Sequence, residues 1–263
     1  MSWLSLRRAL GLGTLLCLIS VAPAHADSAL RLDWPGTFGV RPAVTYDTER
    51  HRVGDAEVRI EKLPDGNLSL SSVSGFTGAD RTLMRALLEP VDGGRHLRPV
   101  WQESRSFDAD ERALGRLHID HREGVARCFT ADGEKRAELT LPAEDRVANV
   151  TLSLLFLPLV RGDAEELSFD LFFCGLGFRF ITFSANLATE SQNGSPQHAL
   201  EVRYGPDLGI ASFVANALVP KLSVWFTPEQ PHAWLAHRLP LYGGGPEVLV
   251  VRKGVPPRWL GDD

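Results

Sequence analysis

The sequence has little cysteine, little methionine and no excess of basic charge. Its 263 residues include three cysteines and two methionines, and 28 Lys and Arg stand against 33 Asp and Glu, so the formal charge is −5. Three cysteines are too few for a disulfide-rich scaffold, and an acidic surface is a poor partner for nucleic acid. We therefore expect an ordinary hydrophobic core and no nucleic-acid partner.

Long apolar runs are confined to the first residues. The chain opens with MSWLSLRRALGLGTLLCLISVAPAHA, where Arg7 and Arg8 precede an apolar stretch of about 13 residues and Ala24-His25-Ala26 forms a small-x-small site. A membrane-spanning helix needs about 20 apolar residues. We therefore expect residues 1–26 to be an export signal cleaved after Ala26, not a membrane anchor.

The rest of the chain, residues 27–263, is predicted to be a single periplasmic domain. It contains no linker-like stretch, and all-β domains of roughly this size often stay undivided. Loss of Arg7 and Arg8 with the signal removes two basic residues and no acidic ones, so the formal charge moves from −5 to −7.

Two cysteines, Cys128 and Cys174, remain once Cys17 leaves with the signal. An exported protein meets an oxidising environment in which a pair tends to close. The sequence alone does not show whether their Cα atoms come within the ~4.4–6.8 Å that a disulfide needs. A disulfide and two separate buried thiols are both open alternatives.

Most of the chain has the pattern of short β-strands. Segments of period two recur from Ala43 onward, separated by turns such as Pro64-Asp65-Gly66 and Asp108 to Glu111, with a bend expected at Val53-Gly54-Asp55. The predicted fold class is mainly β: a curved antiparallel sheet or partly open β-barrel with one helix. That helix is expected at Asp80 to Glu89, because its leucines recur at helical spacing.

The segment Val147 to Leu187 is the most apolar part of the mature chain. It reads VANVTLSLLFLPLVRGDAEELSFDLFFCGLGFRFITFSANL, and its Phe, Val and Thr content predicts the central strands of the sheet. Asn149 to Phe156 is expected to be the first of these strands, with a loop at Leu159 to Asp163. The polar segment Ala188 to His198 is predicted to be a surface loop.

The sequence contains no motif that indicates catalysis or a cofactor. It has no G-x-S-x-G turn, and the segment His118 to Glu123 places only His118 and Asp120 on one strand face together with the competing Arg122. His232 and His237 would lie on opposite faces of a continuous strand. We therefore predict no catalytic residues, no metal and no cofactor.

The order of these features resembles the DUF3108 family, a domain of unknown function found in exported bacterial envelope proteins. The resemblance lies in VGDAEVRIEKLPDGNLSLSSVSG, LRPVWQESRS, EDRVANVTLSLLFLPLVRGD and LSVWFTPEQPHAWLAHRLPL, and covers Val44 to about Lys253. It implies a curved antiparallel sheet wrapped partly round a helix, broadly similar to periplasmic lipoprotein-carrier folds. It implies no catalytic residues.

Two functions fit these features best, and a hydrolase or transferase is a third alternative. The first is a non-enzymatic protein that binds an apolar ligand, such as a lipid or acyl chain, on the concave face of the sheet. Its expected binding residues are Phe172, Phe178, Phe180 and Phe183, although an ideal strand would place Phe183 opposite Phe178 and Phe180. The second is a structural or interaction module that binds another envelope protein.

The export signal can be tested on protein recovered from the periplasm. Because Ala24-His25-Ala26 is the cleavage site, amino-terminal sequencing should read Asp27 first. An intact Met1, or an acyl group on Cys17, would contradict this prediction.

Overall fold

The computed structural model describes residues 30–34, 37–76, 80–175, 177–188, 199–207, 222–241 and 245–256. Nearly all of the regular structure in these ranges is β-strand. The elements are β1 (Leu32–Asp33), β2 (Gly39–Tyr46), β3 (Arg52–Lys62), β4 (Leu68–Gly75), β5 (Arg81–Val91), a 3₁₀ turn (Asp92–Gly94), β6 (His96–Phe107), β7 (Ala113–Asp120), β8 (Val125–Phe129), β9 (Lys135–Thr140), α1 (Leu152–Leu155), α2 (Leu157–Arg161), β10 (Glu166–Phe173), β11 (Arg179–Leu187), β12 (Leu200–Pro206), β13 (Leu222–Phe226), β14 (Trp234–Pro240) and β15 (Glu247–Arg252).

The described strands form one curved antiparallel sheet that is not closed, which confirms the predicted fold class. Its order is β10-β11-β12-β13-β14-β15-β2-β3-β4-β5-β6-β7-β8-β9, with β1 paired to β6. Strands β9 and β10 follow one another in the chain yet lie at the two ends of the sheet. The sheet is therefore an up-and-down meander that is open between β9 and β10.

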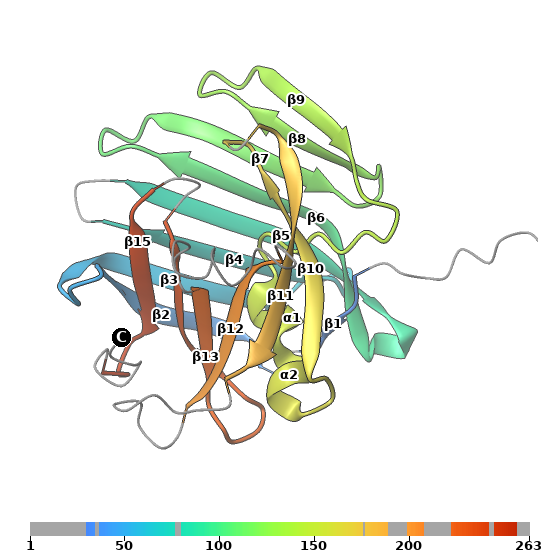
Figure 1. The fold of residues 1–263 in the computed structure, drawn as a ribbon, viewed down its shortest axis with the longest axis vertical. Helices are drawn as coiled ribbons and strands as arrows, with labels where there is room; N and C mark the ends of the chain where they lie inside the picture. Colours follow the sequence, from blue (N-terminus) through green and yellow to red (C-terminus); the bar gives the residue numbers. More distant parts are fainter. Residues whose placement is uncertain are drawn as a thin grey trace, which may run out of the picture.

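The two parts of the sheet lie face to face. Figure 1 shows β10 to β13 and β15 running across β2 to β6, with α1 and α2 between the two layers. We call the face of the sheet toward these helices the inner face. The main core lies here, because apolar side chains from both layers and from the helices form one buried cluster.

The predicted strand at Asn149 to Phe156 is wrong, because this segment is helical. Apart from Ser153 and Arg161, the residues of α1 and α2 are apolar, and Phe156 and Leu159 are almost fully buried. Short helices that are mostly apolar are found inside a core, and Pro158 stands in the first turn of α2, where a missing N–H is tolerated. Gly162 ends α2 in the left-handed conformation, with φ of 79°.

Strands β10 and β11 do form in the second half of the apolar segment, but they are not central. They stand at one end of the strand order. The position of a strand within a sheet depends on its pairing with distant segments, which apolar content does not specify.

The predicted helix at Asp80 to Glu89 is also wrong, because these residues lie almost entirely in strand β5. The inward residues Ala86 and Leu88 are buried at a period of two, and β5 is paired on both sides, with β4 and with β6. Pro90 has no N–H group to donate to a neighbouring strand. It is tolerated because the pairing of β5 with β4 ends at Leu88, opposite Leu68, so no strand on that side lies beside Pro90.

The predicted turns have mixed outcomes. Pro64-Asp65-Gly66 and Asp108 to Glu111 do separate consecutive strands, as expected. The bend expected at Val53-Gly54-Asp55 is wrong, since all three residues lie within β3. Gly54 is needed there for close approach: a Cβ at this position would come within 1.8 Å of the Gly75 carbonyl oxygen.

Several sequence predictions lie outside the described residues. They are the export signal over residues 1–26 and the loop at Ala188 to His198, of which only Ala188 is described. Among the described residues, no helix is long and apolar enough to span a membrane.

A disulfide between Cys128 and Cys174 joins the two ends of the sheet. Cys128 lies in β8 near one end, and Cys174 follows β10 at the other, with Cα atoms 5.7 Å apart. A second buried cluster surrounds it and includes Ile119 from β7 and Phe172 from β10. The ends of the open sheet are thus held by side chains instead of by strand pairing.

Removal of this disulfide should destabilise the protein substantially. The bond spans 46 residues, for which chain entropy alone gives about 4 kcal/mol as an upper value. The variant Cys128→Ala/Cys174→Ala should therefore unfold at a lower urea concentration than the oxidised wild type. Reduced wild type is the matched control and should behave like the variant; an unchanged midpoint in both would contradict the prediction.

Candidate functional site

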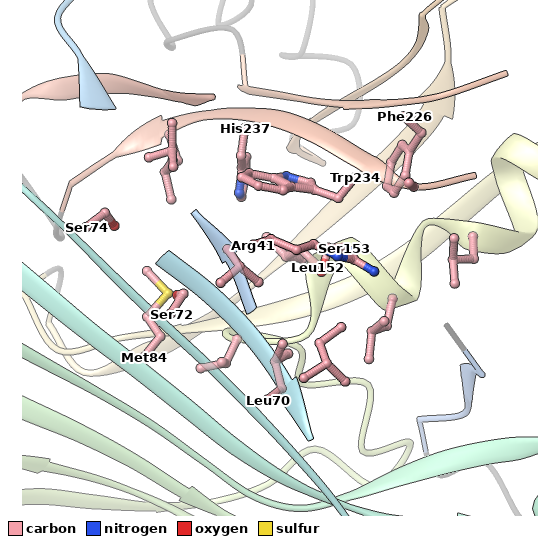
Figure 2. Close-up of a pocket in the computed structure, with 18 of the residues that line it drawn as sticks. Arg41, Leu70, Ser72, Ser74, Met84, Leu152, Ser153, Phe226, Trp234 and His237 are labelled. Atoms are coloured by element: carbon pink, nitrogen blue, oxygen red, sulfur yellow. The ribbon is translucent and has the colours of Figure 1, made fainter. Parts of the chain in front are cut away.

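A cavity opens on the inner face between β2 to β5 on one side and β13 to β15 on the other. Its volume is about 110 Å³, and α1 contributes to its wall. Figure 2 shows the labelled side chains of the two layers on opposite sides of it: Phe226, Trp234 and His237 on one, Leu70 and Met84 on the other. Most of the wall is aliphatic or aromatic.

Small side chains on β4 create the space. The inward residues of this strand change from leucine at Leu68 and Leu70 to serine at Ser72 and Ser74. Both leucines are almost fully buried in the main core, and Leu70 also borders the cavity, whose wall continues along β4 with the two serines. Because a serine leaves unfilled the volume that a leucine would occupy, the core is solid at one end of β4 and hollow at the other.

A bulge lets both Trp234 and His237 of β14 join Leu239 in the cavity wall. The pairing of β13 with β14 shifts between Trp225 and Phe226, so that Phe226 pairs with Trp234 while Val224 pairs with His237. Trp234 and His237 therefore both face inward although they are three residues apart. His232 precedes β14 and also lines the cavity, so the expectation that His232 and His237 lie on opposite faces is wrong.

His237 is a neutral polar group within an apolar wall. Its Nε2 atom lies 2.7 Å from the hydroxyl of buried Tyr204, and the two share a hydrogen bond. Burial lowers the pKa of His237 to about 3 and raises the pKa of Tyr204. At neutral pH this pair carries no charge, so it adds polarity to the cavity without adding an ionic group.

Arg41 is the charged side chain in the cavity wall. It belongs to β2 and extends between the two layers in Figure 2. Its Nη2 atom donates a hydrogen bond to the Thr37 hydroxyl, which also lines the cavity. Burial, and then repulsion from Arg252, hold the pKa of Arg41 below its ordinary value.

The four phenylalanines expected to bind ligand lie elsewhere and do not form one group. Phe172, Phe178 and Phe180 belong to the cluster around the disulfide, where the rings of Phe172 and Phe180 are 5.0 Å apart. Phe183 faces the main core and stacks on Phe169. None of the four lines the cavity.

The residues around His118 do not converge on one point. His118 and Asp120 lie on β7, and burial lowers the pKa of His118. His121 lies in the following turn, where its Nδ1 atom is 2.9 Å from a carboxylate oxygen of Asp145. No group of three metal-ligating residues converges anywhere in the described ranges.

A buried amide explains the role of His121. The Gln102 Nε2 atom donates to the Val147 carbonyl, its Oε1 atom accepts from the Val150 N–H, and His121 is a third partner. This network attaches the segment before α1 to β6. A buried network whose members all have partners rigidifies the part of the core that contains it.

Sequence reasoning missed the cavity because its signal lies on several separate strands. The pair of inward serines on β4 was a usable local signal, since alternation at Leu68, Leu70, Ser72 and Ser74 interrupts an otherwise apolar face. The opposing wall and the bulge in β14 depend on pairing that no local pattern reveals.

Among solved structures, three chains match this one. A solved structure titled as a beta-barrel-like protein of domain of unknown function DUF1849, from Brucella abortus, aligns with a TM-score of 0.43 and 9% identity, covering 85% of this chain and 97% of that one. No family model and no curated protein matches the chain. The resemblance to the DUF3108 family therefore stays a prediction.

The low pKa of His237 predicts acid sensitivity. In the unfolded chain its pKa is near 6.5 and in the folded chain about 3, so the unfolded state binds more protons between these values and stability falls as pH falls below about 6.5. From pH 7 to 5, this residue lowers the free energy of unfolding by at most about 2 kcal/mol.

Urea unfolding at several pH values measures this effect. The variant His237→Gln keeps a hydrogen-bonding side chain without titrating, so its stability should change less between pH 7 and 5 than that of the wild type. His51→Gln removes an exposed histidine and should keep the wild-type slope. Equal slopes in wild type and His237→Gln would refute the assignment.

Proposed function

We propose that this chain is a non-enzymatic periplasmic protein that binds an apolar ligand, such as a lipid or acyl chain, through the cavity on the inner face of the sheet. The observation that carries the proposal is the cavity itself: a largely apolar hollow beside a core that is otherwise packed with leucine and phenylalanine. Protein cores rarely leave such spaces without a reason.

The size of the cavity limits what enters it. A volume of about 110 Å³ is somewhat less than the ~150 Å³ of an engineered apolar cavity that binds benzene. It therefore accommodates a short aliphatic segment and not a whole lipid. The ligand enters with one end, and the remainder of a longer chain extends from the mouth.

Export is supported by two separate features. The first is the amino-terminal pattern that ends at Ala26. The second is the disulfide between Cys128 and Cys174, since structural disulfides persist in oxidising compartments. A carrier or sensor of apolar molecules in the periplasm is consistent with both.

An interaction module in an envelope complex is the second candidate. Its support is the exposure of Phe38 and Val40 at the start of β2, each 47% exposed. Exposed apolar groups that lie close together mark contact surfaces in some proteins. Two side chains are a small area for such a surface, so the cavity has the stronger support.

Binding of 1-octanol, an uncharged aliphatic probe, tests the cavity. Each buried methylene contributes ~0.8 kcal/mol, and because only part of the chain enters, we expect a dissociation constant on the order of 1 mM by calorimetry or nuclear magnetic resonance titration. The variant Ser72→Phe should abolish binding because its ring fills the space.

Ser71→Phe is the matched control. Ser71 is the preceding residue of β4 and faces away from the cavity, so this variant should bind the probe like the wild type. Extraction of protein purified from its own envelope, followed by mass spectrometry, then identifies the natural ligand. Failure of octanol to bind the folded wild type would overturn the proposal.

A further inference from the structure

We infer that Arg41 binds an anionic head group, a carboxylate or a phosphate, of the ligand whose aliphatic part occupies the cavity. This inference rests on the proposed function and adds the chemical class of the ligand. The cavity would then take an amphipathic acid with its charged end at β2 and its aliphatic end toward the wall of Leu70 and Met84.

The position of Arg41 supports this role. It is partly buried and lines the cavity together with Thr37, its hydrogen-bond partner. A guanidinium has five N–H donors, so one bond to a hydroxyl leaves most of them available. Carboxylate and phosphate oxygens are the groups that match the fork of an arginine.

A second arginine increases the positive potential at this place. Arg252 of β15 pairs with Ala43 of β2, and cross-strand partners share a face of the sheet. Ala43 belongs to the main core, so Arg252 and Arg41, two residues before Ala43, are both on the inner face. Arg252 repels Arg41, an arrangement that an anion between or beside them would relieve.

The lack of a carboxylate partner distinguishes Arg41 from arginines elsewhere in the fold. Arg59 on the outer face of β3 binds Glu57 and Glu61, and Arg161 of α2 lies 2.6 Å from Asp33. Within the described residues, no carboxylate lies within ion-pair distance of Arg41. A partly buried cation without a counter-charge costs stability, and a bound anion would supply the missing partner.

The test compares three probes with the same eight-carbon chain: octanoate, octyl phosphate and 1-octanol. Calorimetric titration of the wild type should show that at least one anionic probe binds more tightly than octanol. Arg41→Met replaces the arginine with an uncharged, flexible side chain. It should weaken binding of the anionic probe by about tenfold to a hundredfold, while octanol binding changes little. Comparison of the two anions identifies the preferred head group.

Arg59→Met is the matched control. It removes an arginine one strand away on the opposite face, so all three probes should bind as they do to the wild type. Added salt should weaken binding of the anionic probe more than binding of octanol. Urea unfolding without ligand should place the midpoint of Arg41→Met at or above that of the wild type, because the substitution removes an unpaired charge.

Three results would overturn the inference. If Arg41→Met weakens octanol and the anionic probes equally, Arg41 only shapes the cavity. If its urea midpoint falls clearly below that of the wild type, Arg41 has a structural role. If octanol binds the wild type and neither anion binds more tightly, the head-group inference fails while the proposed function stands. If octanol does not bind the wild type either, both the inference and the proposed function fail.

Discussion

The open junction between β9 and β10 is the constraint on which the rest of the structure depends. Each pair of neighbours in the strand order is joined by a ladder of backbone hydrogen bonds. Strands β9 and β10, which stand at the two ends of this order, are not joined in this way. The disulfide between Cys128 and Cys174 holds them together. Asn149, in the segment that follows β9, attaches this segment to β10, because its side-chain amide both donates to and accepts from the backbone of Phe172. The two ends of the sheet therefore stay attached to each other and to the segment between them without a strand ladder between β9 and β10.

The segment between β9 and β10 fills part of that space. It enters the interior as α1 and α2, whose leucines join the main core. At its start, Val147 and Val150 are bound by the side chain of Gln102 on β6. The cavity lies beside α1, at the end of β4 where the inward residues are serines. The main core is packed and lies directly beside the cavity. It therefore holds the side chains of the cavity wall in position.

The general architecture could be predicted from the sequence, but its pairing could not. Alternation and turn residues indicated an antiparallel sheet, because strand period and turn chemistry are local properties. Residues 81–91 show the limit: Met84 and Leu88 satisfy a helical spacing and a strand spacing equally, and only pairing with β4 and β6 decides. The Leu-rich run at 152–161 has no clear period, so its helices follow from burial, not pattern. The inward serines of β4 were a local signal, but the complete cavity could not be predicted, because Arg41, Ser72 and His237 come from three strands that meet only in the folded sheet.

The electrostatic character of the cavity follows from two opposite responses to burial. His237 loses its charge when buried, because the pKa of an imidazole lies close enough to neutral pH for desolvation to make it neutral. Arg41 keeps its charge, because a guanidinium titrates so far above neutral pH that a lowered pKa still leaves it protonated. The site therefore has a permanent positive charge at one place in a neutral wall. An anion that binds the folded chain alone would stabilise it in proportion to its affinity, so occupancy and stability would rise together, and the empty protein would be the less stable form.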